Sequence, residues 1–167
     1  DRRKTDQGVT RNWLLAAGNA GGTITVWDVA QKIPRNYFRG SEHHIWAVQF
    51  SPDGSTLASC GRYKAKLWNV ANGRQLLSIP VANTLPCLAF SPDGERLAVA
   101  AIKMHSPQYG VYLFETNSGA GIRSFRGLAG SVAKVWLSGN SRLLAALSSN
   151  WRVGIWETET GRLLNIL

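Results

Sequence analysis

The segment Trp46-Ala-Val-Gln-Phe-Ser-Pro-Asp-Gly54 decides the fold, because the chain repeats it at regular intervals. A close copy, Cys87-Leu-Ala-Phe-Ser-Pro-Asp-Gly94, and a looser copy, Val135-Trp-Leu-Ser-Gly-Asn140, follow it. After each copy comes a short apolar run and then an alternating stretch that ends in an aromatic residue. With one further copy upstream, these aromatic markers lie 41, 46 and 42 residues apart, at Trp27, Trp68, Phe114 and Trp156. A period of this length predicts equivalent structural units that pack side by side.

Each repeat is predicted to contain short β-strands, because apolar residues alternate and Gly, Asn, Asp and Pro interrupt them. In the second repeat we expect strands near Ile45–Phe50, Thr56–Cys60, Lys64–Trp68 and Gln75–Ile79. The first of these is apolar on both sides, so both faces of its sheet must be covered. Radially packed sheets cover one another in this way, whereas an immunoglobulin-like sandwich predicts strands with one polar face. We therefore predict an all-β chain.

The repeats resemble those of the WD40-repeat β-propellers over roughly Trp13 to Leu167. The resemblance is carried by Ser51-Pro-Asp-Gly54, Ser91-Pro-Asp-Gly94, Gly22-Thr-Ile-Thr-Val-Trp-Asp28 and Thr160-Gly-Arg-Leu-Leu164. It implies a β-propeller of WD40 type with about four four-stranded blades, whose aromatic markers pack between blades. The chain lacks the Gly-His pair of that family and the Asp that precedes its marker. We therefore expect the blades to depend on packing and on backbone hydrogen bonds.

The repeats also predict how the chain is divided. We expect residues 1–12 to form an N-terminal segment and the start of the first blade, and residues 13–167 to form the propeller blades. The blades are predicted at about 13–39, 40–79, 80–126 and 127–167. About fifteen strands are expected, because the first repeat supplies only three. Three arrangements remain open: an incomplete ring that is part of a larger propeller, two chains paired into one eight-bladed ring, and a closed four-bladed ring.

The charge balance indicates what kind of partner the chain binds. Its 167 residues include 19 Lys and Arg against 10 Asp and Glu, a formal net charge of +9. This surplus favours acidic or phosphorylated protein segments, or nucleic acid. No apolar stretch is long enough for a membrane helix, and no signal peptide is visible. Because Cys60 and Cys87 are predicted to be buried, reduced thiols, we expect an intracellular protein, cytoplasmic or, in a eukaryote, nuclear.

A candidate binding site comes from the loops between the second and third strands. In propellers of the family that the chain resembles, these loops lie on one side of the ring with the connections between blades. Here they combine basic and aromatic residues, which together bind acidic peptides, phosphate groups or single-stranded nucleic acid. The predicted partner-binding residues are Arg62, Tyr63, Lys64, Lys103, His105, Tyr109, Trp151 and Arg152. The alternative to a binding site is that these loops are solvated and that their aromatic residues pack against neighbouring blades.

Catalytic signatures are absent from the sequence, which has no HExxH, GxSxG or Walker motif. Two of its few carboxylates, Asp53 and Asp93, belong to predicted turns. We therefore expect no catalytic residue, no cofactor and no metal. The sequence predicts a non-catalytic scaffold for protein–protein interaction within a larger assembly or multidomain protein. The alternative is a nucleic-acid-binding propeller that uses the same basic, aromatic loops on RNA.

Overall fold

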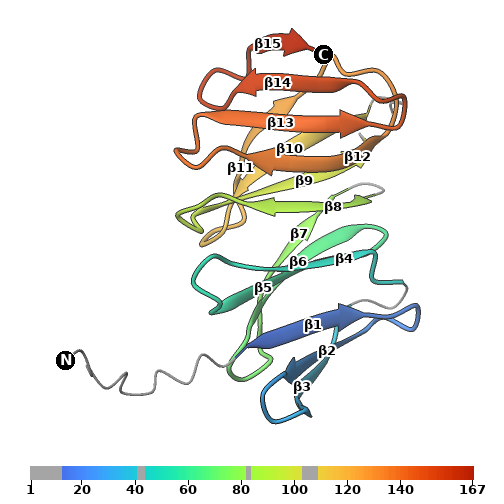
Figure 1. Ribbon diagram of the computed structural model, residues 1–167, viewed down its shortest axis with the longest axis vertical. Coiled ribbons are helices and arrows are strands. Elements are labelled where there is room, and N and C mark those ends of the chain that lie inside the picture. The colour runs from blue at the N-terminus through green and yellow to red at the C-terminus, as the bar shows by residue number, and fades with distance from the viewer. Residues whose placement is uncertain (1–12, 41–43, 82–83, 103–108) are drawn as a thin grey trace, which may run out of the picture.

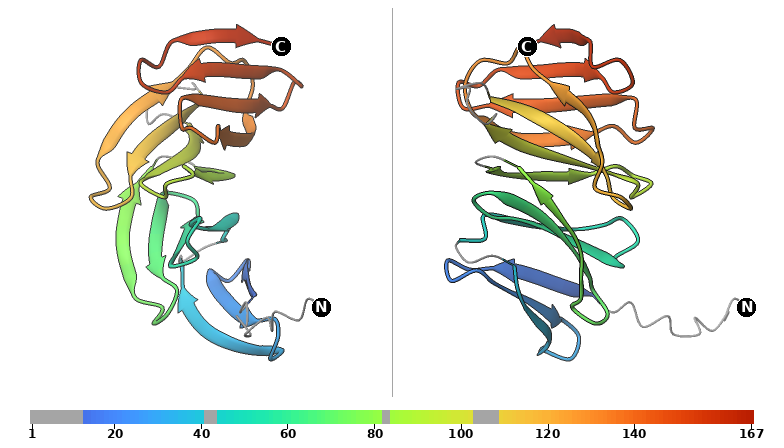
Figure 2. Two further views of the ribbon diagram at one scale, coloured as in Figure 1. Left: turned by 60° about the vertical axis from the view of Figure 1, so that its left-hand side comes forward. Right: turned by 180° about the vertical axis from the view of Figure 1, so that it is seen from behind.

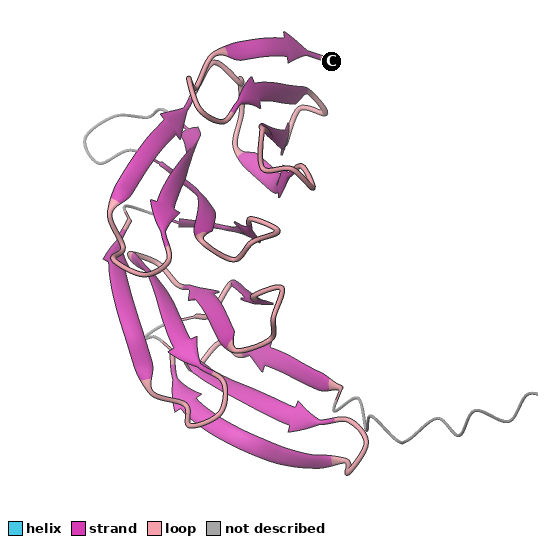
Figure 3. Cartoon of the chain, turned by 90° about the vertical axis from the view of Figure 1, so that its left-hand side faces the viewer, coloured by secondary structure: helices cyan, strands magenta, loops and turns pink. Residues whose placement is uncertain are grey.

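The computed structural model describes residues 13–40, 44–81, 84–102 and 109–167, whose regular secondary structure consists of β-strands (Figure 1). Within these residues, fifteen strands form four antiparallel sheets. The sheets follow one another as blades along a curved array that is not closed into a ring (Figure 3). The predicted all-β propeller architecture is therefore confirmed, together with the predicted number of strands.

Each blade is a meander in which consecutive strands pair, with three described strands in blade 1 and four in each later blade. Blade 1 contains β1 (Leu14–Gly18), β2 (Thr23–Asp28) and β3 (Ile33–Arg39). Blade 2 contains β4 (Ala47–Phe50), β5 (Thr56–Cys60), β6 (Lys64–Asn69) and β7 (Gln75–Pro80). Blade 3 contains β8 (Thr84–Phe90), β9 (Arg96–Ile102), β10 (Tyr109–Glu115) and β11 (Gly121–Phe125). Blade 4 contains β12 (Val132–Leu137), β13 (Leu143–Ser148), β14 (Val153–Glu157) and β15 (Leu163–Ile166).

The strand order gives the array an inner edge and two distinct sides. β8 packs between β4 and β12 at the inner edge, whereas β3, β7 and β11 follow the convex outside of the arc (Figure 2). Because consecutive strands are antiparallel, the β1–β2, β5–β6 and β13–β14 loops lie on the same side as the connections between blades. We call this the loop side. The remaining turns lie on the opposite side, which we call the turn side.

The aromatic markers occupy equivalent places in all four blades. Each pairs across the sheet with a leucine: Trp27 with Leu15, Trp68 with Leu57, Phe114 with Leu97, and Trp156 with Leu144. At every marker the pairing with the outermost strand also shifts register. Such a shift places an extra residue in one strand and re-aims the side chains beside it. The same irregularity at all four markers confirms that the repeats are equivalent structural units.

The core consists of three apolar clusters, and each lies between two adjacent blades. Blades 1 and 2 share one cluster, in which the ring of Phe38 stacks on Trp68 with centroids 4.9 Å apart. Blades 2 and 3 share the second, and Phe114 packs against it. Blades 3 and 4 share the third, where Phe125 meets Trp156 edge-on at 6.2 Å. Since apolar contacts cross every boundary, packing between blades holds the array together.

Every internal boundary joins two defined blade faces. We call the face that carries the marker the leading face, since it meets the preceding blade, and the opposite one the trailing face. Trp68 and Trp156 are buried as predicted, whereas Phe114 and Trp27 are half-buried. Phe114 packs against the cluster between blades 2 and 3, and no described blade covers the leading face of blade 1. Besides this packing, two marker indoles make hydrogen bonds: Trp68 donates to Ser59 Oγ of its own blade at 2.9 Å, and Trp156 donates to the Arg126 carbonyl at the end of blade 3 at 2.9 Å.

Two further sequence expectations can be compared with the fold. Cys60 and Cys87 are both buried and form no disulfide, as predicted. Burial is the main cause that raises the pKa of the Cys87 thiol to about 12, so this thiol is unreactive at neutral pH. The part of the chain that the structure describes contains no helix that could cross a membrane.

Candidate partner-binding side of the array

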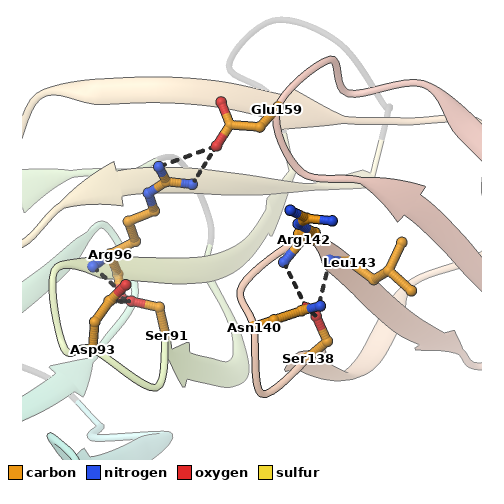
Figure 4. A network of polar contacts seen from close by, with 8 residues as sticks. All are labelled: Ser91, Asp93, Arg96, Ser138, Asn140, Arg142, Leu143 and Glu159. Atoms are coloured by element: carbon orange, nitrogen blue, oxygen red, sulfur yellow. Dashed lines mark hydrogen bonds and ion pairs between the residues drawn. The ribbon is translucent and has the colours of Figure 1, made fainter.

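The turn side is built from one recurring hydrogen-bonded turn. In blade 3, Ser91 Oγ accepts from the Arg96 amide at 2.9 Å and donates to Asp93, which in turn accepts from the Glu95 amide at 2.9 Å. Blade 4 repeats the arrangement with an amide, since Ser138 donates to Asn140 Oδ1 at 2.7 Å (Figure 4). Blade 2 repeats it with Ser51 and Asp53. These side chains close the first turn of each blade, which explains the Ser-x-Asp pattern in the sequence.

Hydrogen bonds within these turns stabilise the ionised form of their carboxylates. Donation from Ser51, and then from Ser55, lowers the pKa of Asp53 from 3.8 to about 2. Donation from Ser91 likewise lowers the pKa of Asp93. Hydrogen bonds to a carboxylate stabilise its charged form, so a low pKa here has a structural cause. Neither carboxylate is placed to act as a general acid or base near neutral pH.

A polar hollow on the turn side contains an ion pair between neighbouring blades. Glu95, Arg96, Glu115, Thr116, Asn117 and Ile122 line it. The guanidinium of Arg96 contacts Glu159 of blade 4 at 3.2 Å, and Glu115 accepts from Ser118 at 2.7 Å (Figure 4 shows the Arg96 pair). Within the described residues, no group of three or more His, Cys, Asp and Glu side chains could hold a metal ion. On the turn side, the Arg96–Glu159 pair therefore joins blade 3 to blade 4.

The loop side differs from the turn side in charge. All seven described carboxylates lie in or beside the turns of the opposite side: Asp28, Asp53, Asp93, Glu95, Glu115, Glu157 and Glu159. The described loops and blade connections of the loop side carry exposed basic residues instead: Arg39, Arg62, Lys64, Arg126 and Arg152. A side with cations and without described carboxylates attracts anionic partners.

In blade 2 the predicted site residues form one compact loop. Arg62, Tyr63 and Lys64 are consecutive and exposed between β5 and β6. The Arg62 guanidinium lies over the Tyr63 ring at 5.2 Å from its centroid, and the Tyr63 carbonyl accepts from the Val81 amide at 2.9 Å. The amide of Gly61 donates to the Lys64 carbonyl at 3.1 Å, which closes the loop. This loop presents a cation and an aromatic face on an anchored backbone.

In blade 4 the loop between β13 and β14 displays Trp151 and Arg152. Trp151 is 84% exposed, and its φ of 63° puts a bulky residue in the left-handed region. The amide of Trp151 donates to the Ser148 carbonyl at 3.1 Å, and Ser148 Oγ donates to Asn150. A bulky side chain in this conformation carries a cost of roughly 1–2 kcal/mol. The loop therefore holds a strained, solvent-facing indole next to a guanidinium.

Blade 1 contains the same loop with a glycine in place of the tryptophan. Gly22 has a φ of 82° and donates to the Asn19 carbonyl at 3.2 Å, as Trp151 donates to Ser148. The next residue, Thr23, donates to the Asn19 side chain at 3.0 Å, as Arg152 donates to Ser148 Oγ. Both Gly22 and Trp151 lie five residues before their marker. The loop conformation therefore suits glycine, and blade 4 adopts it with tryptophan.

The structure brings the predicted site residues together only in part. Blades 2 and 4 each present a basic, aromatic group on the loop side, with blade 3 between them. Tyr109 begins β10 and is half-buried, so its backbone belongs to the sheet. Lys103 and His105 lie outside the described residues. Three exposed loop-side residues were not predicted: Arg39 and Arg126 at the ends of outer strands, and Trp46 beside β4. Their positions at blade connections are the sequence signal that could have identified them.

An open array of equivalent antiparallel blades, each with one aromatic marker, defines the repeat class of β-propeller proteins. Residues 33–69, which span the end of blade 1 and most of blade 2, match the family model described as WD domain, G-beta repeat. This match agrees with the four equivalent markers and their shared turns. The chain therefore contains a WD40 repeat at these residues and is similar to the WD40-repeat family.

Several curated proteins are similar to this chain. Small ribosomal subunit protein RACK1 of Drosophila melanogaster is 34% identical over 47% of this chain and 25% of its own length. Protein groucho, also of Drosophila melanogaster, is 32% identical over 50% of this chain and 12% of its own length. WD repeat-containing protein SL1-17 of Schistosoma mansoni is 26% identical over 90% of this chain and 49% of its own length. The chain thus spans half or less of each of these relatives.

Proposed function

We propose that this WD40 array is a non-catalytic scaffold that binds an acidic segment of another protein on its loop side. The observation that carries the proposal is the distribution of carboxylates: every described carboxylate belongs to the turn side, where Arg and Lys also lie, while the described loops opposite carry exposed Arg and Lys without a described carboxylate. The rigid blades supply a preorganised support for those loops, so little ordering is required on binding. RACK1, groucho and SL1-17 support a scaffold of the WD-repeat class, without identifying a partner.

The basic, aromatic groups in blades 2 and 4 support recognition of a mixed acidic and apolar segment. The Arg62 and Lys64 side chains provide charge next to the exposed ring of Tyr63. Trp151 offers an indole with little contact to its own protein, and Arg152 adjoins it. Tryptophan, tyrosine and arginine are the residues that most often carry binding energy at interfaces. An extended segment with carboxylates and one apolar residue matches this chemistry.

The proposal can be tested by charge reversal on one side of the array at a time. The loop-side variant is Arg62→Glu with Arg152→Glu, and the control with equal charge change is Arg74→Glu with Arg142→Glu on the turn side. All four arginines are exposed. The probe is a fluorescein-labelled peptide of Glu residues with one central Phe, followed by fluorescence anisotropy. We expect the loop-side variant to weaken binding at least roughly tenfold and the control to change it much less. Equal weakening by both variants would contradict the proposal.

Nucleic acid is the second candidate, because the same basic and aromatic groups can contact phosphates and stack on bases. The same two variants can be titrated with a fluorescein-labelled single-stranded RNA. Phosphate-driven binding loses affinity steeply as salt rises, by orders of magnitude between low and moderate concentrations. Tighter binding of RNA than of the acidic peptide at moderate salt, with loss in the loop-side variant, would replace the proposed function with RNA binding.

A further inference from the structure

Two adjoining hollows on the turn side form one groove across blades 2 and 3. The larger is the polar hollow described above, with a volume of about 460 Å³, and the smaller has a volume of about 160 Å³. Asp53 and Leu76 of blade 2 and Asp93 of blade 3 line the smaller hollow, so it lies where the two blades meet. Thr116 and Asn117 line both hollows, which are therefore continuous. We call the two hollows together the turn-side groove.

The turn-side groove is acidic although the chain is basic. Four described carboxylates line it: Asp53, Asp93, Glu95 and Glu115. Among the described residues that line it, Arg96 is the cation, and its guanidinium extends to Glu159 of blade 4 at 3.2 Å (Figure 4). The groove therefore carries an excess of negative charge on a chain with a formal net charge of +9. Because screening limits charge interactions in solution to about 8 Å at physiological salt, this local excess decides what the groove attracts.

Each hollow also contains an exposed apolar side chain from an outer strand. Leu76 of β7 lines the smaller hollow and is 47% exposed, and Ile122 of β11 lines the larger hollow and is 36% exposed. Both occupy the same place in their blades, because each follows the residue that pairs with the marker. Covering exposed apolar surface is favourable by roughly 25 cal/mol per Å². Both halves of the groove therefore combine carboxylates with an apolar contact.

The aspartates of the groove are fixed in position by their turns. Donation from Ser51 and Ser91 is the main cause that lowers the pKa of Asp53 and of Asp93, so both are charged at neutral pH. In Asp93 the hydrogen bonds from Ser91 and from the Glu95 amide both go to Oδ1. Because Asp93 is exposed, its Oδ2 can accept from a bound partner. Binding to such a preorganised carboxylate requires little ordering of the protein.

We propose that the turn-side groove binds an extended, basic segment of another protein, in which Arg or Lys side chains flank an apolar residue. Guanidinium and ammonium groups make charge-assisted hydrogen bonds to carboxylates, and the apolar residue covers Leu76 or Ile122. The described walls of the groove belong to blades 2 and 3, so the site does not depend on what adjoins blade 1 or blade 4. It goes beyond the proposed function, because it gives the scaffold a second surface of opposite charge on the opposite side.

The first test removes negative charge from the groove and keeps its turns. Blade 4 builds the same turn with Asn140, so Asp53→Asn with Asp93→Asn should retain the hydrogen bonds and the fold. The matched control is Asp28→Asn with Glu157→Gln, an equal charge change on the turn side outside the groove. The probe is a fluorescein-labelled peptide of Arg and Gly with one central Leu, followed by fluorescence anisotropy at physiological salt. We expect the groove variant to weaken binding about 3- to 10-fold and the control to change it much less.

The second test concerns the apolar contact and leaves the charge unchanged. Leu76→Thr removes apolar surface from the smaller hollow, and threonine is well accommodated in a strand. Leu164→Thr is its matched control, because Leu164 has the same place in blade 4, is 44% exposed and lines neither hollow. We expect Leu76→Thr to weaken binding of the basic peptide about 2- to 5-fold and Leu164→Thr to leave it unchanged. Equal effects of the two substitutions would overturn the apolar contact.

A comparison of the two peptides separates this site from the loop side. Asp53→Asn with Asp93→Asn should leave binding of the acidic peptide unchanged, and Arg62→Glu with Arg152→Glu should not weaken binding of the basic peptide. Loss of either proposed surface therefore leaves the other measurable. If the unaltered chain fails to bind the basic peptide, or if the groove variant and its control weaken binding equally, the turn-side groove is not a site for a basic segment. Near-ultraviolet circular dichroism checks that each variant is folded, and Glu95→Gln provides a second groove variant outside the Ser-x-Asp pattern.

Discussion

Blades 1 and 2 carry the same residue types at equivalent positions but differ in what covers them. Leucine, tryptophan and valine form the leading face of both blades. In blade 2 they are buried against Phe38 and its neighbours, whereas in blade 1 the leucine and valine are exposed and the tryptophan is half-buried. The backbone irregularity at the marker is the same in both. The comparison indicates that a blade's conformation is encoded within its own repeat, while the burial of its leading face depends on the preceding repeat.

The largest effect that this comparison predicts concerns the tryptophan markers of blades 1 and 2. Trp68→Ala should lower the free energy of unfolding by about 3–5 kcal/mol, because it leaves a cavity beside Phe38 and removes the hydrogen bond to Ser59. Trp27→Ala should cost only about 1 kcal/mol in the dilute chain, because that side chain is half-exposed. Urea denaturation followed by far-ultraviolet circular dichroism measures both. Equal losses would show that neighbouring blades do not determine the contribution of a marker.

The next effect concerns the loop that blade 4 builds with Trp151 and blade 1 with Gly22. Trp151→Gly should raise the free energy of unfolding by about 1 kcal/mol, because it relieves the left-handed conformation. The same change should weaken binding of the acidic, apolar peptide, since it removes the exposed indole. Trp151→Ala is the matched control, because it removes the ring but keeps a Cβ in the strained conformation. Weaker binding in both variants with a gain of stability only in the glycine variant is the expected result.

The equivalence of repeats explains what could be predicted from the sequence. The markers, the Ser-x-Asp turns and the number of strands follow from local patterns, and the structure confirms them. The exposure of Trp27 could not be predicted, because it depends on which blades lie beside it and not on its own repeat. The left-handed conformation of Trp151 had a signal that was not used, namely its alignment with Gly22 relative to the marker. Grouping of the loop-side residues depends on the curvature of the array, which local patterns do not specify.

A smaller effect comes from the turn between the last two strands of each blade. Gly73, Gly119 and Gly161 occupy one position of this turn with φ between 71° and 74°, and Lys32 occupies it in blade 1 with φ 57°. Lys32→Gly should therefore stabilise the chain by about 0.5–1 kcal/mol, as measured by urea denaturation. Lys32→Ala, which keeps the Cβ, should give no comparable gain. A gain of equal size in the alanine variant would indicate that removal of the lysine charge is the cause.

The smallest effect compares the first turns of blades 2 and 4, which contain Asp53 and Asn140 at the same position. Hydrogen bonds from Ser51 and Ser55 lower the pKa of Asp53 from 3.8 to about 2. Because the folded pKa lies below the unfolded one, the stabilisation is complete above about pH 4 and is lost as the pH falls towards 2. Asp53 is almost fully solvated, so we expect a loss of no more than about 0.5 kcal/mol. Asp53→Asn should flatten the acid branch of the stability profile, and Asn140→Asp should steepen it. A profile that neither substitution alters would mean that these turns hold a carboxylate and an amide equally well at every pH, and that the acid sensitivity of the array arises elsewhere.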